Sequence, residues 1–154
     1  MSLHTALVKT EEEKISSEKA KKFISSEANG AESIFIGRVR NENSGKKVTA
    51  VTYDALDQAV IKSFQSICNN AKNKFDKNAM IFLEHAKGYA PVGEISILIA
   101  VGSGHRDEAF KICRYILEEV KHQSPIWKKR TLRRWERRMA SWTFIKTKKK
   151  NTIK

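Results

Sequence analysis

The chain has 154 residues, 40% hydrophobic and 31% charged, a composition typical of a single globular domain with one core. It contains no run of 18 apolar residues and no secretory pattern at its start, so we expect no membrane segment and a cytoplasmic location. Two distant cysteines, Cys68 and Cys113, belong to no Cys or His cluster, which argues against a disulfide framework and a structural metal.

The net charge of +13 is concentrated at the C-terminal end of the chain. Residues 1–120 contain 17 Lys and Arg against 16 Asp and Glu, whereas residues 121–154 contain 13 Lys and Arg against Glu136 alone. The body of the protein is therefore nearly neutral, and the excess basicity is a property of one segment.

The first fifty residues predict a flexible start, a short helix and two strands. Residues 1–15 are polar and acidic with no apolar period, so we expect a flexible N-terminus. A helix is predicted to begin after a cap at Ser16 or Ser17, because apolar side chains then recur at helical spacing until just before Asn29. Two strands separated by a polar loop follow, over 33–39 and 48–53.

Two amphipathic helices and two apolar strands are predicted for the middle of the chain. Apolar side chains recur at three- and four-residue steps over 57–75 and again over 107–121, and each pattern places one cysteine on a buried face. The segments 80–85 and 95–101 predict strands joined by a turn at 88–93. The second strand is apolar almost throughout, which is typical of a central strand covered on both faces. Helices that interrupt several short strands predict an α+β fold.

Cationic clusters lie where these predicted strands and helices end. They consist of Arg38 and Arg40, His105 and Arg106, Lys121, and the run Lys128, Lys129 and Arg130. Segments that leave a sheet toward one end often converge, so we expect the cations to line one pocket that suits a phosphate or a carboxylate. Each cluster alone also fits an ordinary role, such as a solvated strand end, a helix cap or a partner of the helix dipole. The sequence contains no catalytic triad order and no phosphate-cradling glycine motif, and His85 is interpreted as structural.

Four stretches at these clusters occur in an order and spacing that are specific in combination: Phe35–Asn41, Val92–Glu94, His105–Phe110 and Lys121–Lys129. In these stretches the sequence resembles the large-subunit family of molybdopterin synthase, over roughly residues 20 to 130. The resemblance implies an α/β-hammerhead-like fold with an additional small antiparallel β subdomain. It also implies one family domain over 16–146, and a basic, disordered tail is expected over 147–154.

The functional implications of the resemblance concern sulfur transfer in molybdenum cofactor biosynthesis. Two large subunits form a homodimer, and a small ubiquitin-like sulfur-carrier subunit docks on each to give a heterotetramer. The Gly-Gly C-terminus of the small subunit, carrying a thiocarboxylate, supplies sulfur to cyclic pyranopterin monophosphate and so makes the molybdopterin dithiolene. No metal and no cofactor are expected in this subunit, because the pterin precursor is the substrate.

The resemblance also implies roles for individual residues, with Lys121 and Lys128 as the catalytic lysines. The implied substrate-binding positions are Arg38, Val39, Arg40, His105, Arg106, Lys129 and Arg130. A lysine desolvated among other cations has a lowered pKa and can exchange a proton near neutral pH, which an arginine cannot do. Since the nucleophilic sulfur belongs to the partner, the subunit needs no reactive cysteine.

Arg130 departs from the family, which commonly has a glutamate at this place, and residues 131–154 lack the usual ending. Two alternatives therefore stay open. One is a nucleic-acid-binding module that uses the basic, tryptophan-containing C-terminal segment. The other is a non-catalytic dimeric scaffold of the same family. The basic segment has no recognition motif, so we expect no nucleic-acid partner.

Overall fold

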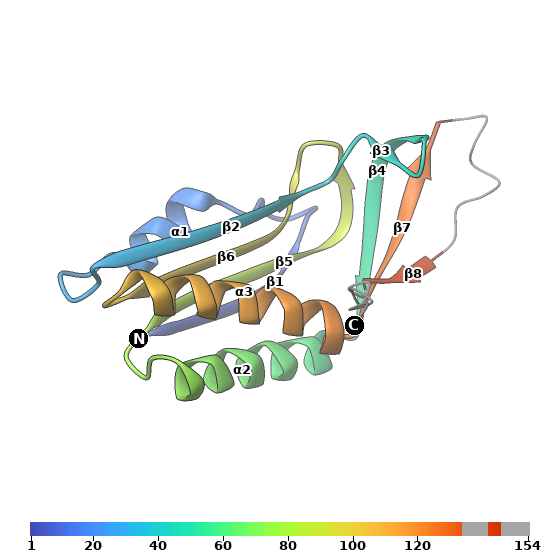
Figure 1. The fold of residues 1–154 in the computed structure, drawn as a ribbon. Coiled ribbons are helices and arrows are strands. Elements are labelled where there is room, and N and C mark those ends of the chain that lie inside the picture. Colours follow the sequence, from blue (N-terminus) through green and yellow to red (C-terminus); the bar gives the residue numbers. More distant parts are fainter. Residues whose placement is uncertain (134–141, 146–154) are drawn as a thin grey trace, which may run out of the picture.

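A computed structural model describes residues 1–133 and 142–145 of the chain (Figure 1). The elements in chain order are β1 (Leu3–Lys9), α1 (Ser17–Ile24), β2 (Ala31–Arg38), β3 (Glu42–Asn43), β4 (Lys46–Ala55), α2 (Asp57–Lys74), β5 (Met80–Pro91), β6 (Ile95–Ser103), α3 (Arg106–Gln123), β7 (Ile126–Leu132) and β8 (Trp142–Phe144). No helix in these described ranges combines the length and the apolar character that crossing a membrane requires.

The long strand β5 joins two parts of the sheet. Its first half pairs with β6 on one edge and with β1 on the other, and its last residues pair with β4 instead. Gly88 lies at this change of partner with a φ of +109°, and a side chain there would meet the Thr10 hydroxyl at 2.6 Å. One part of the sheet therefore has the order β2-β6-β5-β1. The second part, β5-β4-β7-β8, stands at a steep angle to it (Figure 1).

Helices cover both faces of the first part of the sheet. α2 and α3 lie side by side on one face, and α1 lies on the other (Figure 1). Both long helices are confirmed, and most of their apolar positions at helical spacing are buried against the sheet. Phe110, which was expected on the buried face of α3, is instead 65% exposed, because it lies in the first turns of the helix, where the chain leaves the core. β6 is confirmed as a central strand between β2 and β5. The α+β class is thus confirmed, and β3, β4, β7 and β8 form the expected additional antiparallel piece.

Both cysteines lie in the core, as expected. Cys68 is fully buried on α2, and burial raises the pKa of its thiol to about 12. Burial likewise raises the pKa of the Cys113 thiol on α3. Thiols that resist deprotonation in this way are poor nucleophiles, so their role is packing.

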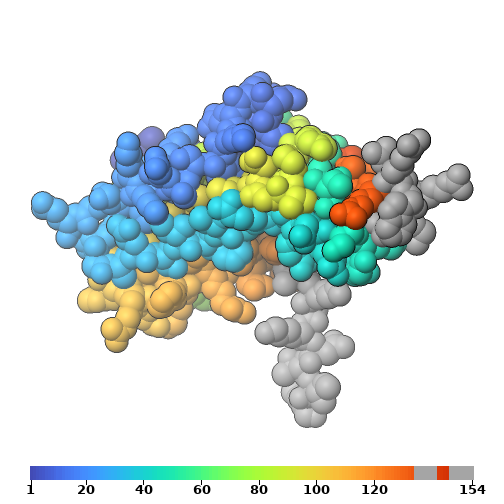
Figure 2. Space-filling view, turned by 90° about the horizontal axis from the view of Figure 1, so that it is seen from above, coloured from blue at the N-terminus to red at the C-terminus, as the bar shows by residue number. Residues whose placement is uncertain are grey.

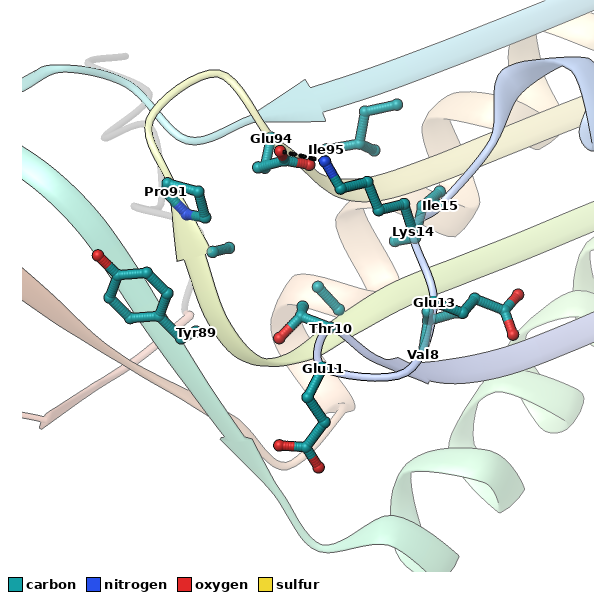
Figure 3. A pocket seen from close by; sticks show the side chains of 12 residues that line it. Val8, Thr10, Glu11, Glu13, Lys14, Ile15, Tyr89, Pro91, Glu94 and Ile95 are labelled. Carbon is teal, nitrogen blue, oxygen red and sulfur yellow. Dashed lines mark hydrogen bonds and ion pairs between the residues drawn. The ribbon is translucent and has the colours of Figure 1, made fainter.

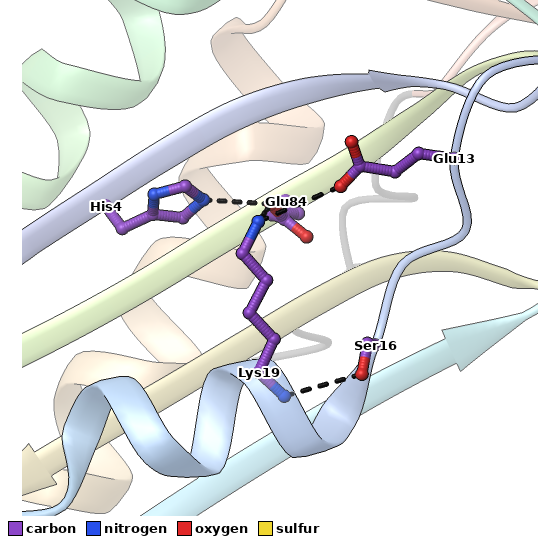
Figure 4. Close-up of polar contacts among 5 residues, drawn as sticks. All are labelled: His4, Glu13, Ser16, Lys19 and Glu84. Atoms are coloured by element: carbon purple, nitrogen blue, oxygen red, sulfur yellow. Dashed lines mark hydrogen bonds and ion pairs between the residues drawn. The ribbon is translucent and has the colours of Figure 1, made fainter.

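The expectation of a flexible segment over 1–15 is wrong for β1, which runs parallel to β5. His4 of β1 donates from Nε2 to the buried carboxylate of Glu84 at 2.8 Å (Figure 4). The ring of His4 also stacks on Phe82, with centroids 4.5 Å apart. The Lys19 ammonium of α1 lies 3.7 Å from the same carboxylate. The polar residues of this segment therefore have partners about eighty positions away, which its own sequence pattern does not reveal.

Two other local predictions differ from the structure. β5 continues to Pro91, so the turn expected over 88–93 begins only at Val92. The basic segment after Pro125, for which no strand was predicted, forms β7 because it pairs with β4 along most of its length. The expected tail over 147–154 lies outside the described residues, and the domain limits remain a prediction.

Candidate functional site

A small polar cleft lies where the end of β2 meets the β4–β7 pair. Five of the predicted site residues line it: Arg38, Val39, Arg40, Lys128 and Arg130. In the space-filling view, the light-blue to turquoise segments from β2 to β4 and the orange β7 meet at one end of the molecule (Figure 2). The cleft therefore brings together two cationic clusters that are about ninety residues apart in the sequence.

The β5–β6 turn holds the arginine-bearing wall of the cleft in place. The Arg38 guanidinium donates from Nη1 to the Gly93 carbonyl at 2.9 Å. The Val39 backbone N–H donates to the Glu94 carbonyl at 3.0 Å, and the Gly93 N–H donates to the Val39 carbonyl at 2.9 Å. These contacts join two of the stretches that carried the family resemblance. The bond to Gly93 thus orients the Arg38 guanidinium toward this turn.

The opposite wall is set by the register of β4 and β7. Lys128 pairs with Tyr53 and Arg130 pairs with Val51, so the two cations are two residues apart and share one face of the sheet. Lys129 alternates to the other face and does not line the cleft. The structure therefore does not bring this predicted binding residue to the others.

Lys128 has an unusual electrostatic environment. It is half-buried, and its pKa is lowered to about 8, first by burial and then by the positive charges of Arg130, Lys121 and Arg40. Lys121 lies in the last turn of α3, which ends just before β7 begins. The structure thus brings the two predicted catalytic lysines within electrostatic range of each other.

Two buried residues beside the lysines were not predicted as part of the site. Tyr53 is 8% exposed, and burial raises the pKa of its hydroxyl, which hydrogen-bonds to Ser96. His85 is 4% exposed, and its ring meets the Tyr53 ring in an edge-to-face contact with centroids 5.0 Å apart. Burial, followed by the charges of Lys121 and Lys128, lowers the pKa of His85 to about 4. A histidine inside an apolar strand, three residues before a glycine, was the available signal.

His105 and Arg106 are far from this cleft within one chain. They are exposed at the N-terminal end of α3, beside Gly30 and Ala31. Arg106 and Lys121 are 15 positions apart on one helix, which corresponds to roughly 22 Å along the axis. The expectation that all the cationic clusters line one pocket is therefore wrong for a single chain, because a straight helix holds two of them apart.

A larger hollow elsewhere on the molecule does not suit an anion. It lies near the bend of β5, and its walls include the apolar side chains of Val8, Ile15 and Ile95 (Figure 3). Its rim includes the carboxylates of Glu11 and Glu13, which repel anions. Among the residues that the structure describes, no group of three or more His, Cys, Asp or Glu is placed to hold a metal ion.

The chain is similar to proteins of known identity over most of its length. Residues 10–123 match a family model described as MoaE protein. A molybdopterin synthase catalytic subunit from Pyrococcus abyssi is 42% identical over 113 residues, 73% of this chain and 75% of that protein. One from Synechococcus elongatus is 39% identical over 109 residues, which cover 71% of this chain and 66% of that protein.

Solved structures share the fold. Molybdopterin synthase from Staphylococcus aureus superposes with a TM-score of 0.79 at 26% identity, covering 93% of this chain and 97% of that one. A complex of subunits 1 and 2 of molybdopterin-converting factor from Helicobacter pylori contains a chain that superposes with a TM-score of 0.60 at 23% identity. That match covers 75% of this chain and 73% of that one.

Proposed function

Because the chain belongs to the MoaE protein family, we propose that it is the catalytic subunit of a molybdopterin synthase, an enzyme of molybdenum cofactor biosynthesis. One structural observation carries the mechanistic part of the proposal. The cleft gathers three arginines, Arg38, Arg40 and Arg130, around a half-buried lysine whose pKa is about 8. This arrangement suits the binding of anions and the exchange of a proton at neutral pH.

The proposed reaction transfers sulfur from a thiocarboxylate to cyclic pyranopterin monophosphate. Both reactants are anions, so a site that brings them together must offset their mutual repulsion with fixed positive charge. Arg38 and Arg40 are the proposed phosphate ligands, since planar guanidinium groups match phosphate oxygens in pairs. Held by Gly93, Arg38 loses little freedom when the substrate binds.

The two lysines have different proposed roles. Lys121 supplies a positive charge at the end of α3. Lys128 exchanges the proton, because its lowered pKa leaves a useful fraction of neutral amine near neutral pH. Arg130 also lines the cleft, and it lowers the pKa of Lys128 more than any other neighbouring charge does. An arginine at this position therefore favours the neutral amine, so we expect the departure from the family's glutamate to be compatible with catalysis.

The proposed partner is a small ubiquitin-like sulfur carrier with a Gly-Gly thiocarboxylate at its C-terminus. The similar Helicobacter pylori chain was solved in a complex of the two subunits of molybdopterin-converting factor, which supports a partner of this kind. The carrier's sulfur is the nucleophile, in agreement with the buried cysteines of this chain. The cytoplasmic location and the heterotetramer remain predictions.

His105 and Arg106 reach the substrate only if a second copy supplies them. β2 is an edge strand that, in the described part of the chain, pairs with β6 alone, and its middle residues are apolar. Such edges are templates for pairing with another strand. Antiparallel pairing of β2 with its copy places Ala31 of one chain beside Arg38 of the other. Arg106 and Ala31 line the same hollow, so this homodimer places Arg106 of one chain beside the cleft of the other.

The function is tested by mixing the purified chain with a thiocarboxylated small subunit and the pterin precursor. We expect mass spectrometry to show a product that has gained two sulfurs, and the Lys128→Ala variant to form almost none. A chain that binds the small subunit but transfers no sulfur is the non-catalytic scaffold instead. Tight binding to DNA without sulfur transfer is the result that supports a nucleic-acid-binding module.

A further inference from the structure

The side of β7 that faces away from the cleft has no role in the mechanism proposed above. Lys129 points to this side, because side chains alternate along a strand and Lys128 lines the cleft. The cross-strand partner of Lys129 on β8 is Trp142, and its partner on β4 is Thr52, which pairs in turn with Tyr89 on β5. Directly paired residues share one side of a sheet. These four side chains therefore form one row across four strands.

Exposed aromatic rings flank Lys129 on this side of the sheet. Tyr89 is 57% exposed and Trp142 is 49% exposed. Trp127 and Phe144, each two residues from a member of the row, face the same way and contact each other with ring centroids 5.9 Å apart. Helices cover the first part of the sheet, and none in the described ranges extends over this surface (Figure 1). Together these residues form the aromatic face, and exposed clusters rich in Trp and Tyr are typical of protein–protein interfaces.

The charge of the aromatic face indicates an acidic partner. Lys129 lies at its centre, where a buried ammonium is tolerated only opposite a carboxylate, since lysine is otherwise depleted at the core of an interface. Asp54, the cross-strand neighbour of Trp127, lies at one end of the face. By sequence, the segments on either side of β8 are basic: 134–141 contains three arginines and one glutamate, and 146–154 contains five lysines and no acidic residue. A partner with carboxylates around an apolar patch therefore matches this surface.

Strand β8 separates the aromatic face from the cleft. Trp142 pairs with Lys129 on one side of the sheet, whereas Thr143 pairs with Lys128 on the other. In the described ranges β8 is an edge strand, so a peptide that passes around it reaches the strand of Lys128 about 5 Å further on. An extended tail of six residues spans about 20 Å, which is enough to pass around this edge.

We propose that the aromatic face binds the folded body of the small sulfur-carrier subunit, through an apolar patch that is bordered by carboxylates. The carrier's C-terminal tail then passes β8 and enters the cleft. This inference rests on the proposed function, since it concerns the partner of that enzyme. It gives a role in partner binding to Lys129, which the cleft does not include, and to β8, which lies in the segment that departs from the family.

Isothermal titration calorimetry with two forms of the small subunit tests this proposal. One form has its complete Gly-Gly C-terminus as a carboxylate, and the other lacks the last six residues. We expect both forms to bind, and Trp142→Ser to raise both dissociation constants about thirtyfold, as for a central aromatic residue of an interface. Lys129→Glu should raise them about tenfold in low salt and less in about 0.5 M salt, where surface charges are screened. Ile61→Ser and Lys62→Glu, at exposed positions of α2, are the matched controls.

Three results overturn the proposal and leave the sulfur-transfer function intact. These are binding of the complete form alone, unchanged dissociation constants in Trp142→Ser, and an equal increase in the control variants. If circular dichroism shows that Trp142→Ser alters the fold, Tyr89→Ser, three strands away, decides in the same way. If Trp142→Ser instead lowers the mass of the chain alone in light scattering, the face binds a second copy and the proposal fails. If the unmodified chain binds neither form, the proposed partner is wrong as well.

Discussion

Replacing Arg130 with glutamate tests whether the charges of the cleft set the reactivity of Lys128. With a pKa of about 8, roughly 9% of Lys128 is neutral at pH 7, against about 0.03% at the ordinary value of 10.5. The environment therefore increases the neutral amine about 300-fold. Arg130 has the largest effect among the neighbouring charges, and a glutamate there exchanges repulsion for attraction.

The pKa of Lys128 should therefore rise in Arg130→Glu. A rise of one pH unit lowers the neutral fraction about tenfold at pH 7, and this effect disappears once the pH exceeds the new pKa. We accordingly expect turnover at pH 7 to fall by about tenfold or more and to recover near pH 10. Lys128→Arg, which retains the charge but cannot release a proton, should lose activity at every pH.

The assay is the initial rate of sulfur transfer from pH 6 to 10, with saturating partner and a control at Arg133. Arg133 directly follows β7 and alternates to the face opposite Lys128, so Arg133→Glu makes the same charge change away from the cleft. In the unmodified enzyme the rate should rise about tenfold per pH unit below pH 8 and then level off. A rate that does not depend on pH would refute the proton-exchange role of Lys128. The same holds if the rate rises over the same pH range in Arg130→Glu and in the unmodified enzyme.

Four further predictions concern assembly, stability and the C-terminal segment. Mixing Lys128→Ala with Arg106→Ala chains and letting the dimers re-form should restore roughly one quarter of the unmodified turnover. About half of the dimers are then mixed, and one of the two sites in each mixed dimer is complete. If no turnover returns, the two chains do not share a site. His85 has a pKa of about 4 when folded against 6.5 when exposed, so the unfolded chain binds more protons between these pH values. Its contribution to stability is full above pH 6.5 and is lost as the pH falls, by about 2 kcal/mol from pH 7 to 5. Urea denaturation at pH 7 and at pH 5 measures this loss. If the free energy of unfolding of His85→Gln falls by the same amount between these pH values, another group causes the loss. Phe64→Ala should lower the free energy of unfolding by about 3 to 5 kcal/mol in the same assay, because that side chain is fully buried; a loss below 1 kcal/mol (roughly a single methylene) would mean that the core relaxes around it. Removing residues 147–154 should leave folding and sulfur transfer nearly unchanged but weaken retention on heparin, since the segment has four lysines; a melting temperature lowered by several degrees would show that it is docked.

The sequence alone determined the elements whose signals are local. The spacing of apolar residues predicts which faces of α2 and α3 are buried and that β6 is covered on both sides. This spacing depends only on which sides of a segment pack against the core. The cationic character of 38–40 and 128–130 was equally visible, because arginine and lysine keep their charge in almost any surroundings. The family resemblance added the roles of Lys121 and Lys128, for which residue identity and order sufficed.

Only the tertiary structure decided which of these groups meet. Strand β1 was missed because His4 finds its partner on β5, and a pairing of that kind has no signature inside a short polar segment. Arg106 was expected beside Lys121, but α3 is straight and keeps the two apart. The lowered pKa of Lys128 and the buried imidazole of His85 depend on the β4–β7 register and on the bend of β5. Desolvation and charge–charge distance arise only after strands distant in the sequence have paired, so residue types alone do not determine them.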